Sequence, residues 1–278
     1  MTKTIQEAAA ARLLLAAHRG VSGGNIPCNT LAAYEIALRQ GADIVEIDVS
    51  VAKDGSLFVF HPGMEPAHLR SQTYIRDMTA EEVRELRFVN QDGVKTTDIV
   101  SPLDDVLELL KGRAYVNIDK FWTAMPEITA AVRRHGMEND VIVKTSADKK
   151  WFDMVEEVAP ELPYMPIISE TDACTEELLR RNINLIGAEV LFKTEGAQVA
   201  SPEYIADMHG KGLLLWANAI VYNYKAVLTA GHSDDISVTG NPDEGWGWLA
   251  DRGFDIIQTD WTLPARLYYE ETGKRFRK

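Results

Sequence analysis

The sequence has little of what marks secreted, membrane-spanning or nucleic-acid-binding proteins. Its 278 residues contain two cysteines, Cys28 and Cys174, with no Cys-x-x-Cys or Cys/His spacing. This scarcity excludes a disulfide scaffold and favours a reducing compartment, although a single disulfide stays open. No apolar run reaches the roughly 18–20 residues that span a bilayer. Acidic residues outnumber basic ones, 42 to 29, and the net charge of −13 disfavours nucleic acid as a partner.

The N-terminal segment has a short apolar run, AAAARLLLAA, that resembles the core of a signal peptide. A single lysine precedes the run, and Glu7 and Arg12 lie beside or within it, which is atypical of such a leader. We therefore expect a cytoplasmic protein without stable membrane association. The sequence leaves the oligomeric state open.

Short apolar runs alternate with amphipathic helical patterns along the whole chain. Helix starts are marked by Ser101-Pro102, by Ser201-Pro202 and by a capping box from Thr79 to Glu82. Strand–helix alternation is typical of a parallel sheet covered by helices. The predicted strands are residues 13–17, 44–49, 57–60, 115–118, 141–144, 164–168, 185–190, 213–216 and 256–258.

Nine strands are one more than a closed eightfold barrel needs. Asp54-Gly55 indicates a two-residue type I′ turn, so residues 44–52 and 56–60 should form a β-hairpin. Setting the return strand aside leaves eight parallel strands. We therefore predict an α/β fold, a TIM-type (β/α)8 barrel that spans residues 1–278 as one domain, with an inserted excursion at about 62–100 that lacks a strong strand.

The hairpin gathers polar side chains at the end of the second strand. A two-residue turn pairs Lys53 with Ser56 and therefore places His61 opposite Asp48. Glu46 shares the face of Asp48, which should point into the barrel. Two inward carboxylates repel each other unless a cation lies between them.

Neighbouring strand ends contribute further polar groups. Asp119 and Asn117 share a face of the following parallel strand, and His18 and Arg19 follow the first strand. Three carboxylates suit a hard cation, Mg²⁺ or Ca²⁺, and arginine binds phosphate oxygens in pairs. A lone histidine or a Glu-x-Asp pair can be merely structural, but their coincidence at the carboxyl ends of barrel strands favours an active site.

These segments resemble the glycerophosphodiester phosphodiesterase family. The resemblance covers the first quarter of the chain closely, and Trp216 and the stretch 258–260 support it more loosely. It is carried by Ala17-His18-Arg19-Gly20, by Pro27-Cys28-Asn29-Thr30-Leu31-Ala32-Ala33-Tyr34, by Gly41-Ala42-Asp43-Ile44-Val45-Glu46-Ile47-Asp48-Val49, by Lys53-Asp54-Gly55 and by His61.

The resemblance implies a role for each matching residue. His18 and His61 would be the acid–base pair, Arg19 a phosphate contact, and the metal ligands would be Glu46, Asp48 and Asp119. The expected activity is metal-dependent hydrolysis of a small-molecule glycerophosphodiester to an alcohol and glycerol 3-phosphate.

The chain departs from the family pattern at several positions. Cys28 and Asp119 stand where the family usually has glutamate, Phe121 stands where it has lysine, Pro62 replaces an aspartate, and Asn218 lies one position early. Strand parity predicts that Lys120 points away from the barrel, so we expect Lys144 to supply the missing cation. The departures suggest a divergent branch with an altered substrate.

Proton-transfer roles and substrate follow as hypotheses. His61 opposite Asp48 should favour its charged form and act as the acid, with His18 as the base. Trp216 would form a wall of the substrate pocket, whereas core packing or a place on a helix surface is favoured for Trp246 and Trp248. An aromatic wall would bind choline by cation–π contact. Two alternatives remain, which are phospholipase D-like cleavage of lysophospholipid or sphingolipid head groups, and a non-catalytic phosphodiester-binding protein. A nucleotide-binding doubly wound fold lacks its glycine-rich loop.

Overall fold

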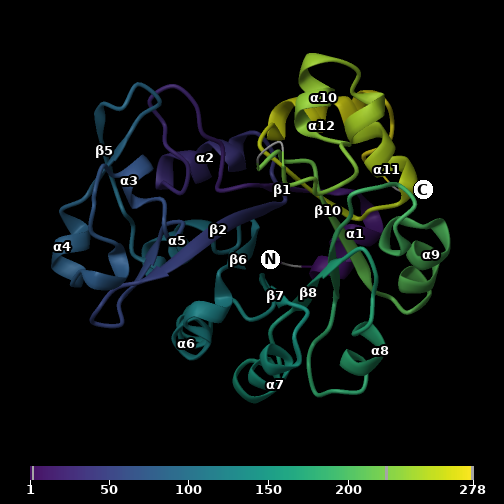
Figure 1. Cartoon of the computed structure of the whole chain (residues 1–278), viewed down its shortest axis with the longest axis horizontal. Helices are drawn as coiled ribbons and strands as arrows, with labels where there is room; N and C mark the ends of the chain where they lie inside the picture. The colour runs from purple at the N-terminus through teal and green to yellow at the C-terminus, as the bar shows by residue number, and fades with distance from the viewer. Residues whose placement is uncertain (2, 223–224, 277–278) are drawn as a thin grey trace.

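Eight parallel strands close into a barrel in the computed structural model, which describes residues 1, 3–222 and 225–276. The order is β1-β11-β10-β9-β8-β7-β6-β2, and pairing of β1 with β2 closes the ring. The prediction of a TIM-type barrel is therefore confirmed (Figure 1). The strands are β1 (Leu14–Ala17), β2 (Ile44–Val51), β3 (Leu57–Val59), β4 (Arg87–Val89), β5 (Lys95–Ile99), β6 (Tyr115–Asp119), β7 (Val141–Ser146), β8 (Tyr164–Ser169), β9 (Gly187–Leu191), β10 (Leu214–Asn218) and β11 (Ile256–Thr259).

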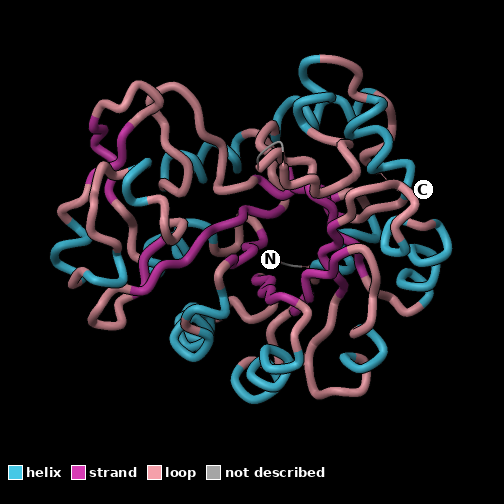
Figure 2. The backbone as a smooth tube through the Cα atoms, viewed as in Figure 1, coloured by secondary structure: helices cyan, strands magenta, loops and turns pink. Residues whose placement is uncertain are grey.

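Helices surround the barrel strands (Figure 2). Ser201 caps α9 with Pro202 at its first position, and the capping box from Thr79 to Glu82 opens α4, as the sequence predicts. Ser101 makes no cap, because α5 begins one residue after Pro102. The helices are α1 (Ile5–Ala11), α2 (Leu31–Arg39), α3 (Glu65–His68), α4 (Ala80–Arg84), α5 (Leu103–Leu110), α6 (Met125–His135), α7 (Lys149–Val158), α8 (Thr175–Leu178), α9 (Pro202–Gly210), α10 (Asp234–Thr239), α11 (Trp248–Arg252) and α12 (Thr262–Glu271), with short turns η1 (Ile75–Asp77), η2 (Phe121–Thr123), η3 (Gln198–Ala200) and η4 (Asp243–Gly247).

Alternation along β2 decides which side chains reach the barrel interior. Val45, Ile47 and Val49 are fully buried in the apolar layer between strands and helices. The opposite face therefore directs Glu46 and Asp48 inward, because successive side chains of a strand point to opposite sides. Both carboxylates are buried.

Helix α1 closes the amino-terminal end of the barrel. Its apolar face, Ile5, Ala8 and Ala9, packs on an interior cluster that includes Ile44 and Trp216. The apolar N-terminal run is thus divided between this plug and strand β1. Within the described residues, no helix has the length and hydropathy needed to cross a membrane.

The hairpin forms, but the predicted register is wrong by one residue. Val49 pairs with Val59 and Ser50 with Phe58, so Phe60 lies opposite Asp48, and its amide donates to the Asp48 carbonyl. A type I′ turn needs positive φ at both central residues, yet only Gly55 of the Asp54-Gly55 pair has one, at 85°. The turn is therefore a three-residue loop that ends in a left-handed glycine.

The excursion after the hairpin packs around a small core of its own. Phe58 and Phe60 of the hairpin contact an apolar cluster that includes Ile75, Val83 and Phe88. Contrary to the expectation of no clear strand here, β4 and β5 pair as a short antiparallel ribbon.

A buried ion-pair network joins the start of β1 to the end of the chain. The Asp43 carboxylate lies 2.6 Å from Arg12 Nη2 and 2.5 Å from Arg275 Nη2, and it accepts a hydrogen bond from the Leu15 amide. Asp43 and Arg275 are both buried, so removal of Asp43 would leave the Arg275 guanidinium without its counter-ion.

We expect Asp43→Ala to lower the free energy of unfolding by about 3–5 kcal/mol, because it strands a buried guanidinium. Urea denaturation monitored by circular dichroism measures this loss. The matched control is Glu35→Ala, which removes the partially exposed carboxylate that lies 2.8 Å from Arg113 and should lower the free energy of unfolding much less, because solvent screens an exposed ion pair. Equal, small losses in both variants would contradict the assigned role of Asp43.

Candidate active site

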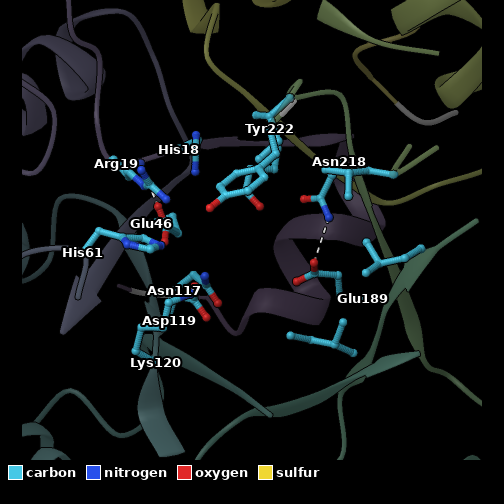
Figure 3. Close-up of a pocket in the computed structure, with 15 residues that line it drawn as sticks. His18, Arg19, Glu46, His61, Asn117, Asp119, Lys120, Glu189, Asn218 and Tyr222 are labelled. Atoms are coloured by element: carbon cyan, nitrogen blue, oxygen red, sulfur yellow. Dashed lines mark hydrogen bonds and ion pairs between the residues drawn. The ribbon is translucent and has the colours of Figure 1, made fainter. Parts of the chain in front are cut away.

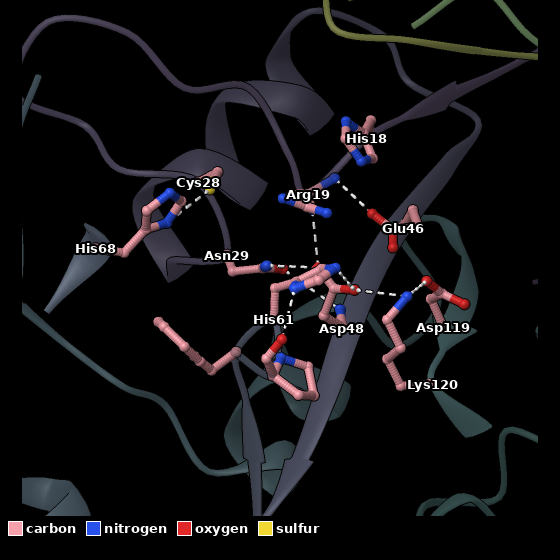
Figure 4. A network of polar contacts seen from close by, with 12 residues as sticks. His18, Arg19, Cys28, Asn29, Glu46, Asp48, His61, His68, Asp119 and Lys120 are labelled. Atoms are coloured by element: carbon pink, nitrogen blue, oxygen red, sulfur yellow. Dashed lines mark hydrogen bonds and ion pairs between the residues drawn. The ribbon is translucent and has the colours of Figure 1, made fainter. Parts of the chain in front are cut away.

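Three carboxylates converge at the carboxyl ends of adjacent strands β2 and β6. Asp48 and Asp119 are register partners, and Glu46 lies one inward position earlier on β2 (Figure 4). One oxygen from each carboxylate lies within 4.8 Å of the others. Glu46 and Asp48 are almost fully buried.

The donor set fits a hard divalent cation. Among the described residues, none donates a hydrogen bond to the buried Asp48 Oδ1. Burial and the neighbouring charge of Asp48 raise the pKa of Glu46 to about 8. An unpartnered carboxylate oxygen and a carboxyl group that resists ionisation both indicate that positive charge belongs between these residues, and oxygen ligands suit Mg²⁺ or Ca²⁺.

Arg19 and Asn29 hold the carboxylates from the side of strand β1. The Arg19 amide donates to Glu46 Oε2 at 2.7 Å, and its Nε lies 2.9 Å from Asp48 Oδ2. Asn29 Nδ2 donates to the same Asp48 oxygen at 2.9 Å. Gly20 follows Arg19 with φ of 78°, and a Cβ there would lie 2.8 Å from the Ala33 backbone, so only glycine allows the loop to lie this close to α2.

Lys120 points into the site, contrary to the prediction from strand parity. Its Nζ lies 2.5 Å from Asp119 Oδ2 and 3.9 Å from Asp48 Oδ1. The physical reason is its left-handed backbone, with φ of 61°, which ends the alternation of β6 at this residue. Burial alone would lower the pKa of Lys120, but Asp119 and Asp48 raise it, so its ammonium group is the cation that faces these carboxylates.

His18 is paired with Asp260 across the junction between β1 and β11. His18 Nδ1 lies 2.8 Å from Asp260 Oδ1. Burial opposes a charge on the ring, but the hydrogen bond to Asp260 and the charges of Glu46 and Asp260 outweigh it and raise the pKa of His18. The imidazolium form is therefore favoured at His18.

His61 has the opposite environment, so the predicted stabilisation of its charged form is wrong. Burial lowers its pKa, Asp48 at 3.9 Å opposes that effect only partly, and Arg19 and Lys120 lower the pKa further. Its Nδ1 lies 3.0 Å from the Pro62 carbonyl oxygen, which can only accept a hydrogen bond. This contact favours the tautomer with the proton on Nδ1, which leaves Nε2 as the unprotonated nitrogen of the neutral ring.

These groups line a cavity of about 360 Å³. His18, Arg19, His61 and the carboxylates Glu46 and Asp119 form one side of it (Figure 3). Residues that the sequence analysis left without a role form the other side, among them Glu189, Asn218, Tyr222 and Gln258. Glu189 and Gln258 lie at the ends of predicted strands, and this position could have indicated that they line the cavity. Tyr222 lies in a loop whose path no sequence motif predicts.

Lys144 and Trp216 lie beneath this cavity, so the prediction that they contact substrate is corrected. Trp216 is fully buried and Lys144 is 1% exposed, and in the described structure neither lines the cavity. Lys144 Nζ lies 2.7 Å from Glu189 Oε2 and 3.1 Å from the centre of the Trp216 ring. The inward alternation of β7 and β10 does place both side chains in the barrel, but at a level too deep for substrate.

The other aromatic candidates also lie away from the cavity. Phe121 and Trp246 are buried in the layer between strands and helices, and Trp248 stacks on His232 with ring centres 3.8 Å apart. Core packing was favoured for Trp246, and this is confirmed. Cys28 lies beside His68, with 3.7 Å from Sγ to Nδ1, and burial raises its pKa to about 11.

Comparisons with known proteins give a consistent result. The model of the glycerophosphoryl diester phosphodiesterase family matches residues 18–260. A glycerophosphodiester phosphodiesterase of Caldanaerobacter subterraneus subsp. tengcongensis is 31% identical over 159 residues, which cover 54% of this chain and 65% of that relative's length. The matched segment thus spans just under two thirds of that relative.

Two solved structures extend the likeness to nearly the whole chain. A glycerophosphoryl diester phosphodiesterase from Parabacteroides distasonis superposes with a TM-score of 0.76 at 18% identity, covering 95% of this chain and 88% of that one. A glycerophosphodiester phosphodiesterase from Agrobacterium tumefaciens gives a TM-score of 0.69 at 26% identity, covering 92% and 99%.

The elevated pKa of Glu46 predicts how stability depends on pH in the presence of chelator. The folded state holds this proton up to about pH 8, whereas an unfolded glutamate releases it near 4.5, so the free energy of unfolding should fall as the pH rises between these values. Glu46→Gln should remove most of this fall and be more stable than the wild type at pH 9. Chemical denaturation at pH 5, 7 and 9 measures both slopes.

The control for this series is Glu176→Gln, which replaces an exposed carboxylate that lies 2.7 Å from Lys211. It should keep the wild-type slope. A Glu46→Gln variant that is less stable than the wild type at pH 9 would show that Glu46 is ionised and stabilising in the metal-free protein.

Proposed function

The chain belongs to the glycerophosphoryl diester phosphodiesterase family, and from this membership we propose that its barrel is a single catalytic domain that hydrolyses a glycerophosphodiester to an alcohol and glycerol 3-phosphate. The observation that carries the proposal is the convergence of two histidines, Arg19 and the carboxylates of Glu46 and Asp119 on one cavity, with the buried carboxylate of Asp48 beside them. This combination supplies both charge neutralisation and proton transfer, which a phosphodiester requires because it is anionic and has a poor alkoxide leaving group.

Glu46, Asp48 and Asp119 would hold one divalent cation, Mg²⁺ or Ca²⁺. When bound, the cation would neutralise phosphate charge and polarise the P–O bonds. Among the described residues none donates a hydrogen bond to Asp48 Oδ1, which could therefore serve as a ligand atom, whereas the neighbouring Oδ2 is already engaged by Arg19 and Asn29.

Arg19 and Lys120 would bind the phosphate. Both cations line the cavity, and both are oriented by carboxylates, Arg19 by Asp48 and Lys120 by Asp119. Lys120 would be the lysine of the phosphate site, a role that the sequence predicts for Lys144. The left-handed backbone of Lys120 would thereby compensate for Phe121, which stands where the family has its lysine.

His18 would be the general acid and His61 the general base. The nucleophile, water or a substrate hydroxyl, would lose its proton to the lone pair of His61 Nε2 while its oxygen bonds to phosphorus. The ester P–O bond would break on the opposite side, and the departing alkoxide would take its proton from the His18 imidazolium, which Asp260 stabilises. These roles reverse the assignment made from the sequence, because burial and neighbouring charges favour the neutral form at His61.

The first test is release of glycerol phosphate from a panel of glycerophosphodiesters. We expect turnover that is abolished by chelator and restored by Mg²⁺ or by Ca²⁺, and reduced at least about 100-fold in His18→Ala and His61→Ala, in line with the usual contribution of acid–base catalysis.

Each alternative function predicts a different result. Metal-dependent thermal stabilisation without turnover of any phosphodiester would support a non-catalytic binding protein and overturn the proposal. Turnover confined to lysophospholipid in vesicles would support head-group cleavage at membranes. The Glu176→Gln variant should behave like the wild type throughout.

A second test concerns the proton on His18. Asp260→Asn removes the carboxylate that raises the pKa of His18, so the pKa should fall. A general acid is active while protonated, so the alkaline limb of the kcat/KM profile should move to lower pH. The acidic limb, which reports deprotonation of His61, should stay in place. Movement of the acidic limb instead would assign His18 as the base.

A further inference from the structure

A buried carboxylate that the mechanism above does not use contacts the chain at Asp260, the partner of His18. Asp234 is the first residue of α10, is 2% exposed, and does not line the catalytic cavity in the described structure. An ionised carboxylate is costly to bury unless hydrogen bonds compensate it. The partners of Asp234 therefore indicate what it holds in place.

Asp234 accepts three hydrogen bonds from three different residues. Its Oδ1 accepts one from Trp246 Nε1 at 2.7 Å and one from Thr259 Oγ1 at 2.7 Å, and its Oδ2 accepts one from the Asp260 amide at 2.8 Å. Burial raises the pKa of Asp234 to about 6 against the effect of these bonds, so the carboxylate is mainly ionised at neutral pH. A charged acceptor makes each of these hydrogen bonds stronger than a neutral acceptor would.

Two of these bonds fix the turn at residues 259–261, which carries the partner of His18. The Asp260 carboxylate lies 2.8 Å from His18 Nδ1, while the Asp260 amide is held by Asp234. The Asp260 side chain is 47% exposed, so packing contributes little to its position. The Thr259 carbonyl accepts a hydrogen bond from the His18 amide at 3.1 Å. The turn is thus tied to Asp234 on one side and to His18 on the other.

We propose that Asp234 is a positioning residue of the active site, which anchors the 259–261 turn and thereby holds the Asp260 carboxylate against His18. This inference rests on the proposed function, in which His18 is the general acid. Without the anchor, the Asp260 carboxylate would leave Nδ1, and the imidazolium form of His18 would lose the hydrogen bond that contributes most to its stability.

Asp234 also stabilises the fold, and this effect has to be separated from positioning. Its bond to Trp246 ties α10 to η4. Trp246 is buried, its amide donates to Ser237 Oγ at 3.0 Å, and its carbonyl accepts a hydrogen bond from the Tyr269 hydroxyl at 3.0 Å. Loss of Asp234 would therefore lower stability as well as release Asp260. Protonation of His18 distinguishes the two effects, because only the release of Asp260 changes it.

The experiment follows the protonation of His18 by NMR in protein with isotope-labelled histidine, at a fixed concentration of Mg²⁺. The His18 resonance is identified by its absence from His18→Gln. In Asp234→Ala, the midpoint of the His18 titration should move to lower pH by at least about 0.5, because a neighbouring opposite charge is lost. Glu46 and Arg19, the other charged groups that face His18, are the same in both proteins.

Asp234→Asn is a second variant that preserves the size of the side chain and protects the test against misfolding of Asp234→Ala. Its single acceptor oxygen cannot serve both Trp246 and Asp260, which lie on different oxygens of the carboxylate. The His18 midpoint should therefore move in the same direction by a smaller amount.

Trp246→Phe is the matched control for stability. It removes one donor from Asp234 but leaves the bond to the Asp260 amide, so thermal unfolding should move to lower temperature while the His18 midpoint stays at the wild-type value. Asp235→Asn, which replaces the exposed neighbour of Asp234, should change neither. In the Asp260→Asn background, Asp234→Ala should cause no further movement of the midpoint, because its effect passes through Asp260.

The outcomes distinguish this inference from the proposed function. An unchanged His18 midpoint in the folded Asp234 variants overturns the positioning role, and so does an equal movement in Trp246→Phe, which would assign the effect to general loosening. A further movement in the Asp260→Asn background overturns the path through Asp260. The titration requires no turnover, so a wild type that hydrolyses no phosphodiester overturns the proposed function alone. In an active protein, the alkaline limb of the kcat/KM profile should move together with the His18 midpoint.

Discussion

Repulsion among three carboxylates at the ends of β2 and β6 is the constraint around which the rest of the site is arranged. Two like charges about 4 Å apart repel by about 4 kcal/mol at the effective dielectric constant of a protein surface, and more when buried. Asp48 lies at the centre, with Arg19 and Asn29 on one oxygen and Lys120 and His61 near the other. Burial and the neighbouring charge of Asp48 together raise the pKa of Glu46 to about 8, so a further positive charge beside Glu46 would favour its ionised form.

Several residues that contact these carboxylates lie in unfavourable backbone conformations. Arg19, Asn29 and Lys120 all have φ between 57° and 61°, a region that non-glycine residues seldom adopt. Each of the three side chains contacts Asp48 or a neighbouring carboxylate. Such backbone strain persists only where the surrounding contacts hold the residue in place, and it is found most often at functional sites. At this site the strained loop backbone is therefore what brings these side chains into contact with the carboxylates.

Periodicity and turn chemistry are sufficient to predict the barrel and the carboxylates of this chain, but not the residues that leave those patterns. Glu46, Asp48 and Asp119 follow from strand alternation, which is a property of the local backbone. Lys120 was assigned to the wrong side because a single left-handed residue breaks that alternation. The hairpin register was wrong by one because Asp-Gly is compatible with two- and three-residue loops. Strand alternation predicts that Lys144 and Trp216 point into the barrel. It does not predict how far along the barrel axis the cavity begins, and both side chains lie below that point.

Both sides of the cavity contain carboxylates with little exposure to solvent, but the two sides balance this negative charge differently. At the carboxylate side three acidic groups lie within 4.8 Å of one another, an arrangement compatible with a divalent cation, and Arg19 and Lys120 face the cavity beside them. On the opposite side of the cavity Glu189 pairs with Lys144 at 2.7 Å and accepts a hydrogen bond from Asn218, so its carboxylate has its partners within the protein. The two sides therefore differ in how much of their charge is balanced within the protein. The protein's overall acidity has little part in this, since the division is made by a few buried pairs within one cavity.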